Sequence, residues 1–596
     1  MTVESKLKRR DLLKGAVLAG AASTAGLVYS GTADAQAQQP PIKWQLEADV
    51  VVIGAGATGL PAAIIAREAG SSVILIEAEN DIGGHAITSA GNVPLGGGTS
   101  AQKKYNIKDS PDLLFGDLTD WSVVEPNGFP DYQFNDREIV RAFADNSAPT
   151  YDWLTAHGVI WVDQAPDANG GICVGNSAPR EMHAAAMAWP LVQTGKPADS
   201  LLQSTFSTGN GLMRPLEAAA KKAGVQILLQ HKMTGIYRET SNSGQVLGIA
   251  VDKNGTKLNI RAHRAVIIGT GGSTGNVEFR RMFDPRLTEE YCGLSGMPWS
   301  NADASGELAG MAVGASLWGF FNYTGEFGNG LTKPGSIGTQ YGYVALQWKE
   351  GSPVFNRVRA TGLEVSDWQN VIMTNMLGKR FYDETGLQFT SNDYNSIKPY
   401  TQGSYLNAKN IKYDPNNWVN AALQGVGDGK NGGGPIWAIF DADGAAREKW
   451  TTKPPKVDIA AGFFFQADTL AELAQKIVMK YQRVPMPPAN LEATIARYNS
   501  FVDAGIDQDF GKPKPAYKIA KPPFYAAWAT PVVHDSRAGL RINAKCQVID
   551  MKGQVIQGLY CGGESAGGFS EHGLARATCQ GFIAGKNAAA ENKRVL

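Results

Sequence analysis

The sequence predicts an α/β protein with a Rossmann-like, largely parallel sheet. The main observation is a set of short apolar runs that each end in glycines or in an acidic residue. These runs lie at 50–59, 73–79, 266–274 and 553–568. Buried parallel strands have continuous apolar sequences, and glycines at their carboxyl ends allow the chain to turn sharply into a helix. The segments come from both ends of the chain, so the sheet is expected to be built from both ends.

The first run contains the pattern "VVVIGAGATG", which is typical of a dinucleotide site. Gly54 permits the tight turn, Gly56 lets the backbone approach a pyrophosphate, and Gly59 lets the following helix pack on the strand. The next segment, "LPAAIIAREAG", has alanine and isoleucine at helical spacing. Glu77 follows Gly54 by 23 residues and is placed to accept hydrogen bonds from ribose hydroxyls. An acidic residue there argues against a 2′-phosphate.

Composition narrows the class of function. The chain has 596 residues, enough for two or three domains, and 56 basic side chains balance 56 acidic ones. The chain has no excess of basic residues that would indicate binding to nucleic acid or to an acidic membrane. A small-molecule partner is therefore expected. Five widely spaced cysteines indicate neither a disulfide framework nor a metal site, and no metal is predicted. A C-x-x-C-H haem motif is absent, so any cytochrome partner would be a separate chain.

Residues 1–37 have the pattern of a removable export signal. A basic start with Arg9-Arg10 precedes an apolar, small-residue run and A-x-A sites that end at Ala35 or Ala37. The arginine pair resembles a twin-arginine signal, whose pathway carries folded proteins. An uncleaved membrane anchor is the alternative, but the run is short and rich in glycine and alanine for a bilayer span. We expect a periplasmic protein with no permanent membrane anchor.

Three further motifs carry a family resemblance. They are "DIGGHAITSAGNVPLGGGTSAQ" at 81–102, "VIIGTGGST" at 266–274 and "GQVIQGLYCGGESAGG" at 553–568. Together with the first glycine turn, they resemble the fumarate reductase and succinate dehydrogenase flavoprotein superfamily, which includes urocanate reductase and 3-ketosteroid Δ1-dehydrogenases. The resemblance implies an FAD-binding domain at 46–320 and 534–596 and an inserted α+β capping domain at 321–533.

The resemblance also assigns FAD contacts. The residues are Gly54, Gly56, Thr58, Gly59, Glu77, Gly84, His85, Ala86, Gly271, Asp535, Glu564, Gly581 and Phe582. His85 stands where the soluble flavocytochromes have asparagine, and a histidine in this loop carries FAD covalently in membrane-bound relatives. Two hypotheses follow: His85 bonds covalently to FAD, or it only forms hydrogen bonds. The "GGHA" context differs from the usual "SHT" and favours the second.

The catalytic assignments also depend on the resemblance. "TPVVHDSRAGLRI" at 530–542 places His534 on the family's substrate-binding histidine, and "SEHGLARATCQG" at 570–581 places Arg576 on its carboxylate-binding arginine, with His572 nearby. An arginine offers planar, bidentate recognition of a carboxylate. "LGKRFYDETGLQFTSND" lacks the arginine with which fumarate reductases transfer a proton, so Tyr382 or Tyr394 is the candidate in its place.

The sequence therefore predicts an exported FAD enzyme that acts on a CH–CH or C=C bond next to a carbonyl or carboxylate. An enoate-type reductase is preferred because of His534 and Arg576. A dehydrogenase of a cyclic ketone or an aromatic compound is the second hypothesis, and a flavin electron-transfer subunit is the third. A c-type cytochrome or a quinone is the expected external electron carrier.

Overall fold

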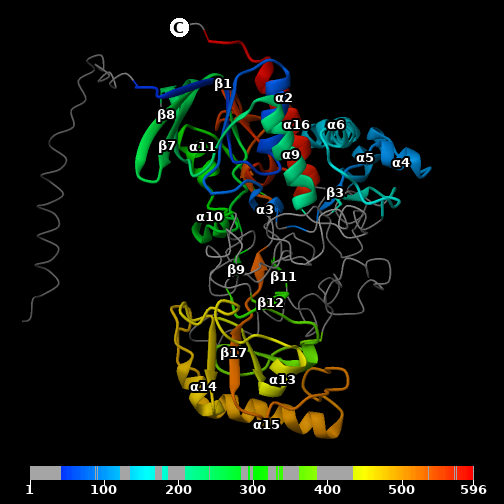
Figure 1. Cartoon of the computed structure of the whole chain (residues 1–596), viewed down its shortest axis with the longest axis vertical. Coiled ribbons are helices and arrows are strands. Elements are labelled where there is room, and N and C mark those ends of the chain that lie inside the picture. Colours follow the sequence, from blue (N-terminus) through cyan, green and yellow to red (C-terminus); the bar gives the residue numbers. More distant parts are fainter. Residues whose placement is uncertain are drawn as a thin grey trace, which may run out of the picture. The chain divides into compact units, whose positions relative to one another are not determined.

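The structure is a computed structural model, and Figure 1 shows its elements in chain order. It describes residues 42–87, 89, 91–120, 135–167, 177–185, 209–240, 242–283, 293–294, 300–319, 331–332, 334–339, 362–385, 434–533, 536–569, 571 and 573–594. The predicted export signal at 1–37 lies outside these residues. Among the described helices, none combines the length and the apolar character that a membrane span needs.

An eight-stranded sheet forms the centre of the nucleotide-binding part. Its strands are β1 (Leu46–Ile53), β2 (Val73–Ile76), β5 (Gln226–Leu228), β6 (Lys232–Thr240), β7 (Ser243–Lys253), β8 (Thr256–Ile268), β20 (Gln547–Ile549) and β21 (Val555–Cys561). The order β21-β8-β1-β2-β5 is parallel throughout, while β20, β7 and β6 add antiparallel pairs. The C-terminal strand β21 pairs directly with β8, so both ends of the chain build one sheet. The predicted α/β fold class is confirmed.

Three helices pack side by side next to this sheet in Figure 1: α2 (Gly59–Glu68), α9 (Asn210–Ala223) and α16 (Gly573–Ala590). Glycine allows α2 and α16 to approach closely. A Cβ on Gly581 would lie 2.3 Å from the carbonyl oxygen of Thr58, and a Cβ on Gly585 would lie 2.5 Å from that of Ala62. Any larger side chain at these two positions would push the helices apart.

The remaining elements of this part are short, apart from one long helix. The helices are α3 (Gly84–Ile87), α4 (Ser100–Lys104), α5 (Pro111–Asp117), α6 (Arg137–Ala156), α10 (Val277–Arg281), α11 (Ser305–Ala312) and the 3₁₀ helix η5 (Gly563–Ser565). The strand pairs are β3 (Asn92–Pro94) with β4 (Glu181–His183) and β10 (Leu317–Trp318) with β19 (Gly539–Leu540). Strands β11 (Leu331–Thr332) and β18 (Val532–Val533) lie within the predicted capping range 321–533, and β18 pairs with β11 and with β9 (Gly293–Leu294).

A second sheet lies within the predicted capping domain. Strands β14 (Ile372–Thr374), β15 (Trp437–Asp441), β17 (Phe524–Trp528) and β16 (Phe464–Ala467) are antiparallel in this order. The other elements here are β12 (Ser336–Ile337), β13 (Leu363–Glu364), η4 (Trp368–Asn370), α13 (Ala442–Arg447), α14 (Leu470–Lys476) and α15 (Pro488–Ala504).

Successive side chains along these strands belong alternately to two separate hydrophobic clusters. Ala438 and Phe440 of β15 belong to one cluster, while Trp437 and Ile439 of the same strand belong to the other. Successive side chains of a strand point to opposite faces, so this sheet is buried on both sides. The result is the inserted α+β unit that the sequence predicts; its limits at 321 and 533 remain predictions.

Candidate active site

The site is built where four parallel strands end. β1, β8 and β21 are neighbours and β2 flanks β1, and their last residues are Ile53, Ile76, Ile268 and Cys561. Carboxyl ends of parallel strands meet at one edge of a sheet, and that edge is where open α/β folds bind ligands. The segments that follow these strands therefore gather at this edge, as the sequence predicts.

The glycine turn after β1 is sterically constrained on one side and open on the other. Gly54 has φ of +96°, and a Cβ there would lie 2.3 Å from the carbonyl oxygen of Gly269. A Cβ on Gly59 would lie 1.8 Å from the carbonyl oxygen of Gly54. At Gly56, in contrast, the nearest atom to an added Cβ is the carbonyl oxygen of Gly83, 3.9 Å away.

The open side of the turn lies at the start of α2. The side chain of Thr58, the N-cap residue, forms no capping hydrogen bond. The first N–H groups of a helix carry partial positive charge and attract anions. Space beside Gly56 next to a helix N-terminus suits a pyrophosphate.

Glu77, at the end of β2, is held against the turn by backbone donors. Its Oε2 accepts a hydrogen bond from the N–H of Ala55 at 2.8 Å, and its Oε1 accepts one from the N–H of Glu79 at 2.9 Å. Burial raises the pKa of this carboxyl to about 7, although the N–H donors act in the opposite direction. A buried carboxylate with remaining acceptor capacity suits ribose hydroxyls, as predicted.

His85 and Glu564 come from opposite ends of the chain, and their side chains lie in polar contact. His85 lies in α3, and its Nδ1 is 3.5 Å from Oε1 of Glu564 in η5. The other carboxylate oxygen of Glu564 accepts a hydrogen bond from the N–H of Ser536 at 3.2 Å. The contact brings two predicted FAD ligands together.

The loop after β8 joins the same cluster. The hydroxyls of Thr270 and Ser565 are 2.9 Å apart, and the N–H of Ser273 donates to Oγ of Ser536 at 2.8 Å. Gly271 has φ of +85°, and the nearest atom to an added Cβ is Oγ of Ser300 at 3.4 Å. Gly84 has φ of +51°, and a Cβ added there would have the Cα of Gly56 as its nearest atom, at 3.9 Å. Both glycines keep the backbone close to the site.

Arg576 lies in the first turn of α16 and is buried. Its Nη1 donates to the carbonyl oxygen of Phe569 at 2.7 Å, and its Nη2 donates to those of Ser536 and Gly563, each at 3.0 Å. The guanidinium is therefore held by three carbonyl oxygens, one from Ser536 and two from the stretch after β21 that also contains Glu564. This anchoring fixes the position of a positive charge at the site.

Other predicted residues have mainly packing contacts. Gly581 lies in the α2–α16 contact, and Phe582 packs edge to face on Trp153 of α6 with ring centroids 6.0 Å apart. Ala86 is buried in α3. Tyr382 is 1% exposed and belongs to a hydrophobic cluster of the four-stranded unit. This position favours a packing role for Tyr382, and its catalytic role stays a prediction.

Four predicted residues lie outside the described part of the chain. They are His534, Asp535, His572 and Tyr394. Their assignments to substrate or FAD stay predictions.

Sequence reasoning missed several residues of this neighbourhood. Ser536, Ser565 and Thr270 are common residue types in loops and give no signal on their own. Glu307 of α11 is fully buried, and in the described residues neither of its carboxylate oxygens has a hydrogen-bond partner. Burial, with the charges of Asp303 and Glu564, raises its pKa to about 8. In the sequence, Glu307 is the acidic residue within the small and apolar helix "SGELAGMA", and this context could have indicated a buried carboxyl group.

The combined geometry fits FAD. The open space beside Gly56, the start of α2 and the Glu77 acceptor suit the ADP half, and the His85–Glu564 pair lies with the glycine loops that follow β8 and β21. The donors and acceptors on both sides are of the types that a dinucleotide needs.

Comparison with known proteins agrees with this fit. The model of the FAD binding domain family matches residues 49–332 and 344–578. A fumarate reductase (cytochrome) of Shewanella frigidimarina is 29% identical over 537 residues, which cover 89% of this chain and 73% of that protein. A 3-oxosteroid 1-dehydrogenase of Mycolicibacterium smegmatis is 25% identical over 596 residues, which cover 87% of this chain and 91% of that protein. The open conformation of a flavocytochrome c3 fumarate reductase has the same fold, with a TM-score of 0.57, 21% identity, and coverage of 99% of this chain and 82% of that one.

Proposed function

Since the chain belongs to the FAD binding domain family, we propose that it uses FAD to reduce a C=C bond next to a carboxylate or carbonyl group. The chain is an FAD-dependent oxidoreductase. When bound, FAD supplies the hydride chemistry, and the protein supplies the position of the substrate and the charge around it.

The observation that carries this proposal is the anchored cation at Arg576. Its guanidinium is fixed by three carbonyl oxygens beside the Glu564 segment, and the resemblance in sequence assigns it the role of the family's carboxylate-binding arginine. A fixed positive charge stabilises the negative charge that develops on the substrate during hydride attack, without reorganisation. Similarity to a fumarate reductase along 89% of the chain supports the same substrate class, an unsaturated acid.

The remaining roles follow from this arrangement. Arg576 and His534 hold the electron-withdrawing group, and His572 lies nearby in the chain. A tyrosine or an acid of the capping domain, with Tyr382 and Tyr394 as the candidates, delivers the proton to the neighbouring carbon. General acid catalysis of this kind needs a donor within hydrogen-bond distance of that carbon.

The second candidate is a dehydrogenase that desaturates a cyclic ketone. It is supported by the 25% identity to a 3-oxosteroid 1-dehydrogenase, of which this chain covers 91%. In that case Arg576 polarises a carbonyl rather than binding a carboxylate, and a base in place of the proton donor removes a proton from the substrate.

Three further points belong to the proposal. Residues 1–37 direct export to the periplasm, and a c-type cytochrome or a quinone exchanges electrons with the flavin. The capping domain spans 321–533, between two parts of the FAD-binding domain at 46–320 and 534–596. His85 binds FAD through hydrogen bonds.

Anaerobic half-reactions followed by flavin absorbance test the function. Reduced enzyme is mixed with enoates and enones, and oxidised enzyme with saturated acids and cyclic ketones. Rapid reoxidation by an enoate supports the reductase. Rapid bleaching by a saturated ketone, with enoates inert, would replace it with the dehydrogenase.

A further inference from the structure

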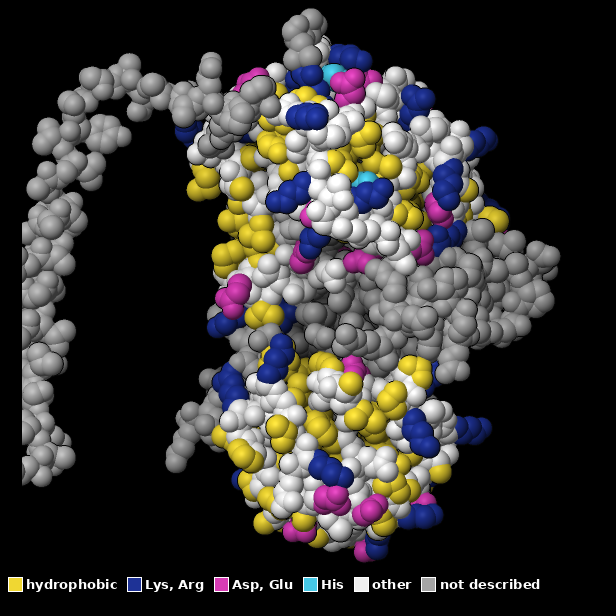
Figure 2. All heavy atoms as spheres, turned by 60° about the vertical axis from the view of Figure 1, so that its left-hand side comes forward, with side chains coloured by type: hydrophobic (Ala, Val, Ile, Leu, Met, Phe, Trp, Pro, Cys, Tyr) yellow, Lys and Arg dark blue, Asp and Glu magenta, His cyan; other side chains and the backbone are white. Residues whose placement is uncertain are grey.

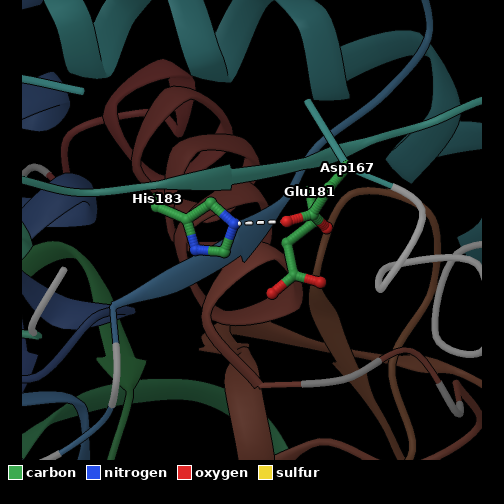
Figure 3. Close-up of side chains that lie close together, drawn as sticks. All are labelled: Asp167, Glu181 and His183. Atoms are coloured by element: carbon green, nitrogen blue, oxygen red, sulfur yellow. Dashed lines mark hydrogen bonds and ion pairs between the residues drawn. The ribbon is translucent and has the colours of Figure 1, made fainter. Parts of the chain in front are cut away.

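A cluster of three ionisable side chains lies outside the FAD site. Asp167, Glu181 and His183 each offer one ligand atom, and these atoms all lie within 4.8 Å of one another (Figure 3). The backbone explains the grouping. Glu181 and His183 are two residues apart in β4, so they share a face, and Asp167 is bridged directly opposite Glu181.

This arrangement places two carboxylates against each other at a buried position. Like charges directly opposite on paired strands are destabilising. Glu181 is 3% exposed, and its Oε1 has no hydrogen-bond partner among the residues that the structure describes. Burying an oxygen of this kind is unfavourable unless a cation or a donor satisfies it.

The arginine that adjoins the cluster in the sequence pairs with two other carboxylates. Arg180 precedes Glu181 in the chain, and its guanidinium forms ion pairs with Asp109 at 2.9 Å and with Asp117 at 2.6 Å. These bonds hold the arginine against carboxylates other than those of the cluster. The imidazole of His183 lies next to Asp167, with Nε2 2.8 Å from Oδ2 of that carboxylate.

The contacts of His183 match those of a metal-binding histidine. Its Nδ1 lies 3.0 Å from Oδ1 of Asn92, and its Nε2 faces Oδ2 of Asp167 at 2.8 Å. When Nδ1–H donates to the amide oxygen of Asn92, the lone pair of Nε2 points into the cluster. Metal-binding histidines commonly donate their other ring N–H to a carbonyl or carboxylate in this way.

We propose that Asp167, Glu181 and His183 form a binding site for a divalent first-row metal ion of the Zn²⁺ or Mn²⁺ class, which fastens β4 to residues 161–167. Two carboxylates balance the charge of a divalent ion, and neutral imidazole with carboxylate oxygen is a donor set that these metals accept. Ligand atoms on a tetrahedral ion with bonds of about 2.0 to 2.2 Å lie roughly 3.4 Å apart, so the His183–Asp167 contact opens by about half an ångström.

The role of the ion is structural. The segment 161–167 already contacts β4 through the N–H of Val162, which donates to the carbonyl oxygen of His183 at 2.9 Å, and through the backbone pair of Asp167 and Glu181. A metal ion would add a side-chain link to these backbone bonds. Three protein ligands leave one position on a tetrahedral ion for water.

Metal analysis of the untagged, FAD-loaded protein tests the proposal. The protein is treated with chelator, incubated with Zn²⁺ or Mn²⁺, desalted and analysed by mass spectrometry for metal per FAD. We expect one equivalent of metal and a higher unfolding temperature in its presence, since an ion that binds only the folded state stabilises it. Less than a tenth of an equivalent with both ions would overturn the proposal.

Variants identify the ligands. His183→Gln and Glu181→Gln should each weaken binding more than about tenfold, and Asn92→Ala should weaken it by about 10- to 100-fold through the histidine it orients. His157→Gln is the matched control, because His157 forms a similar pair with Glu68 at 2.7 Å but has no third ligand in the described residues. Equal binding by His183→Gln and wild type, both with full FAD content, would refute the assignment.

A variant that does not fold is replaced by a spectroscopic test. Cu²⁺ bound to the wild-type protein should show an EPR signal with coupling to one imidazole nitrogen. A signal without nitrogen coupling would exclude His183 as a ligand.

Discussion

The N–H of Ala55 donates a hydrogen bond to the carboxylate of Glu77 at 2.8 Å, and this bond joins the glycine turn after β1 to the end of β2. The same carboxylate accepts the N–H of Glu79 at 2.9 Å. Glu77 therefore shapes the nucleotide site before any ribose reaches it. Its burial makes that arrangement sensitive to pH.

The stability of the FAD-free protein should fall as pH rises from 5 to 8. Burial raises the pKa of Glu77 from 4.5 to about 7, so its contribution is fully present below pH 4.5 and is lost as pH rises through 7. The full shift of about 2.5 pKa units is worth roughly 3.5 kcal/mol at about 1.4 kcal/mol per unit, and roughly 2.5 kcal/mol of it falls between pH 5 and 8. Unfolding midpoints across this pH range measure it. Glu77→Gln should reduce the slope but not remove it, because burial also raises the pKa of Glu307 and of Glu181 to about 8; a slope equal to that of the wild type would contradict the assignment.

Gly59→Ala should abolish FAD binding. The new Cβ would lie 1.8 Å from the carbonyl oxygen of Gly54, a distance that forces the glycine turn to move. The FAD-to-protein ratio, from absorbance of the purified protein, should fall more than about tenfold through loss of this close packing. Gly116→Ala is the control, because an added Cβ there meets nothing within 4 Å. Full FAD content in Gly59→Ala would show that the turn is not the pyrophosphate site.

FAD should leave the protein on acid precipitation. Nδ1 of His85 lies 3.5 Å from the carboxylate of Glu564. We expect this histidine to bind FAD through hydrogen bonds and not through a covalent bond. The supernatant should be yellow and should contain unmodified FAD by mass spectrometry. A yellow pellet that turns colourless in His85→Ala would establish the covalent link instead.

Arg576→Ala should lower kcat by about two orders of magnitude or more, because it removes a fixed charge from the transition state. The substitution also leaves the carbonyl oxygens of Phe569, Ser536 and Gly563 without this donor, so some loss of stability is expected. Arg264→Ala separates the two effects. Arg264 also donates to backbone carbonyls, those of Ala589 and Glu591, and it should lower stability while leaving kcat within about threefold of wild type. Unchanged turnover in Arg576→Ala would favour a flavin electron-transfer subunit.

How far the sequence predicted the structure depends on the range of each interaction. Glycines at strand ends have local steric causes, and the tight turn at Gly54 and the close packing at Gly59 could be predicted from them; the contacts of Gly54, Gly56, Gly59 and Glu77 with FAD stay predictions. The spacing of Ala62, Ile65, Ala66 and Ala69 predicted α2, but Ala69 lies past its end and is exposed, because the helix stops at Glu68.

Side-chain clusters that need distant segments were not predictable from the sequence. Asp167, Glu181 and His183 are brought together by a β-bridge between Asp167 and Glu181, and nothing in their spacing resembles a metal motif. Burial of Tyr382 likewise depends on packing of the whole four-stranded unit rather than on its neighbours in the chain.

Charges of both signs are mixed on the face shown in Figure 2, where Lys and Arg side chains lie among Asp, Glu and apolar side chains. This agrees with the equal totals of 56 basic and 56 acidic residues. Surface ion pairs of this kind contribute little to stability. Buried ones behave differently, and the four-stranded unit contains a group of them.

Glu384→Gln should destabilise this unit by about 3 to 5 kcal/mol. The carboxylate of Glu384 is fully buried, with Oε1 2.7 Å from Nε of Arg380 and Oε2 3.2 Å from Nζ of Lys512. Its neutral replacement removes the carboxylate that Arg380 and Lys512 share, although among the described residues Arg380 keeps its pair with Asp507 at 2.7 Å and Lys512 keeps the carbonyl oxygens of Trp368 and Val371.

The pH dependence of this group has the sign opposite to that of Glu77. Burial raises the pKa of Glu384, but the charges of Arg380 and Lys512 outweigh burial and lower it from 4.5 to about 2. The stabilisation is therefore present above pH 4.5 and is lost as pH falls through 2.

Urea unfolding of the FAD-loaded protein at neutral pH measures the effect of Glu384→Gln. Asp509→Asn is the control, since its pair with Arg497 is exposed and should contribute less than about 1 kcal/mol. Equal losses in the two variants would mean that burial does not strengthen the Glu384 network.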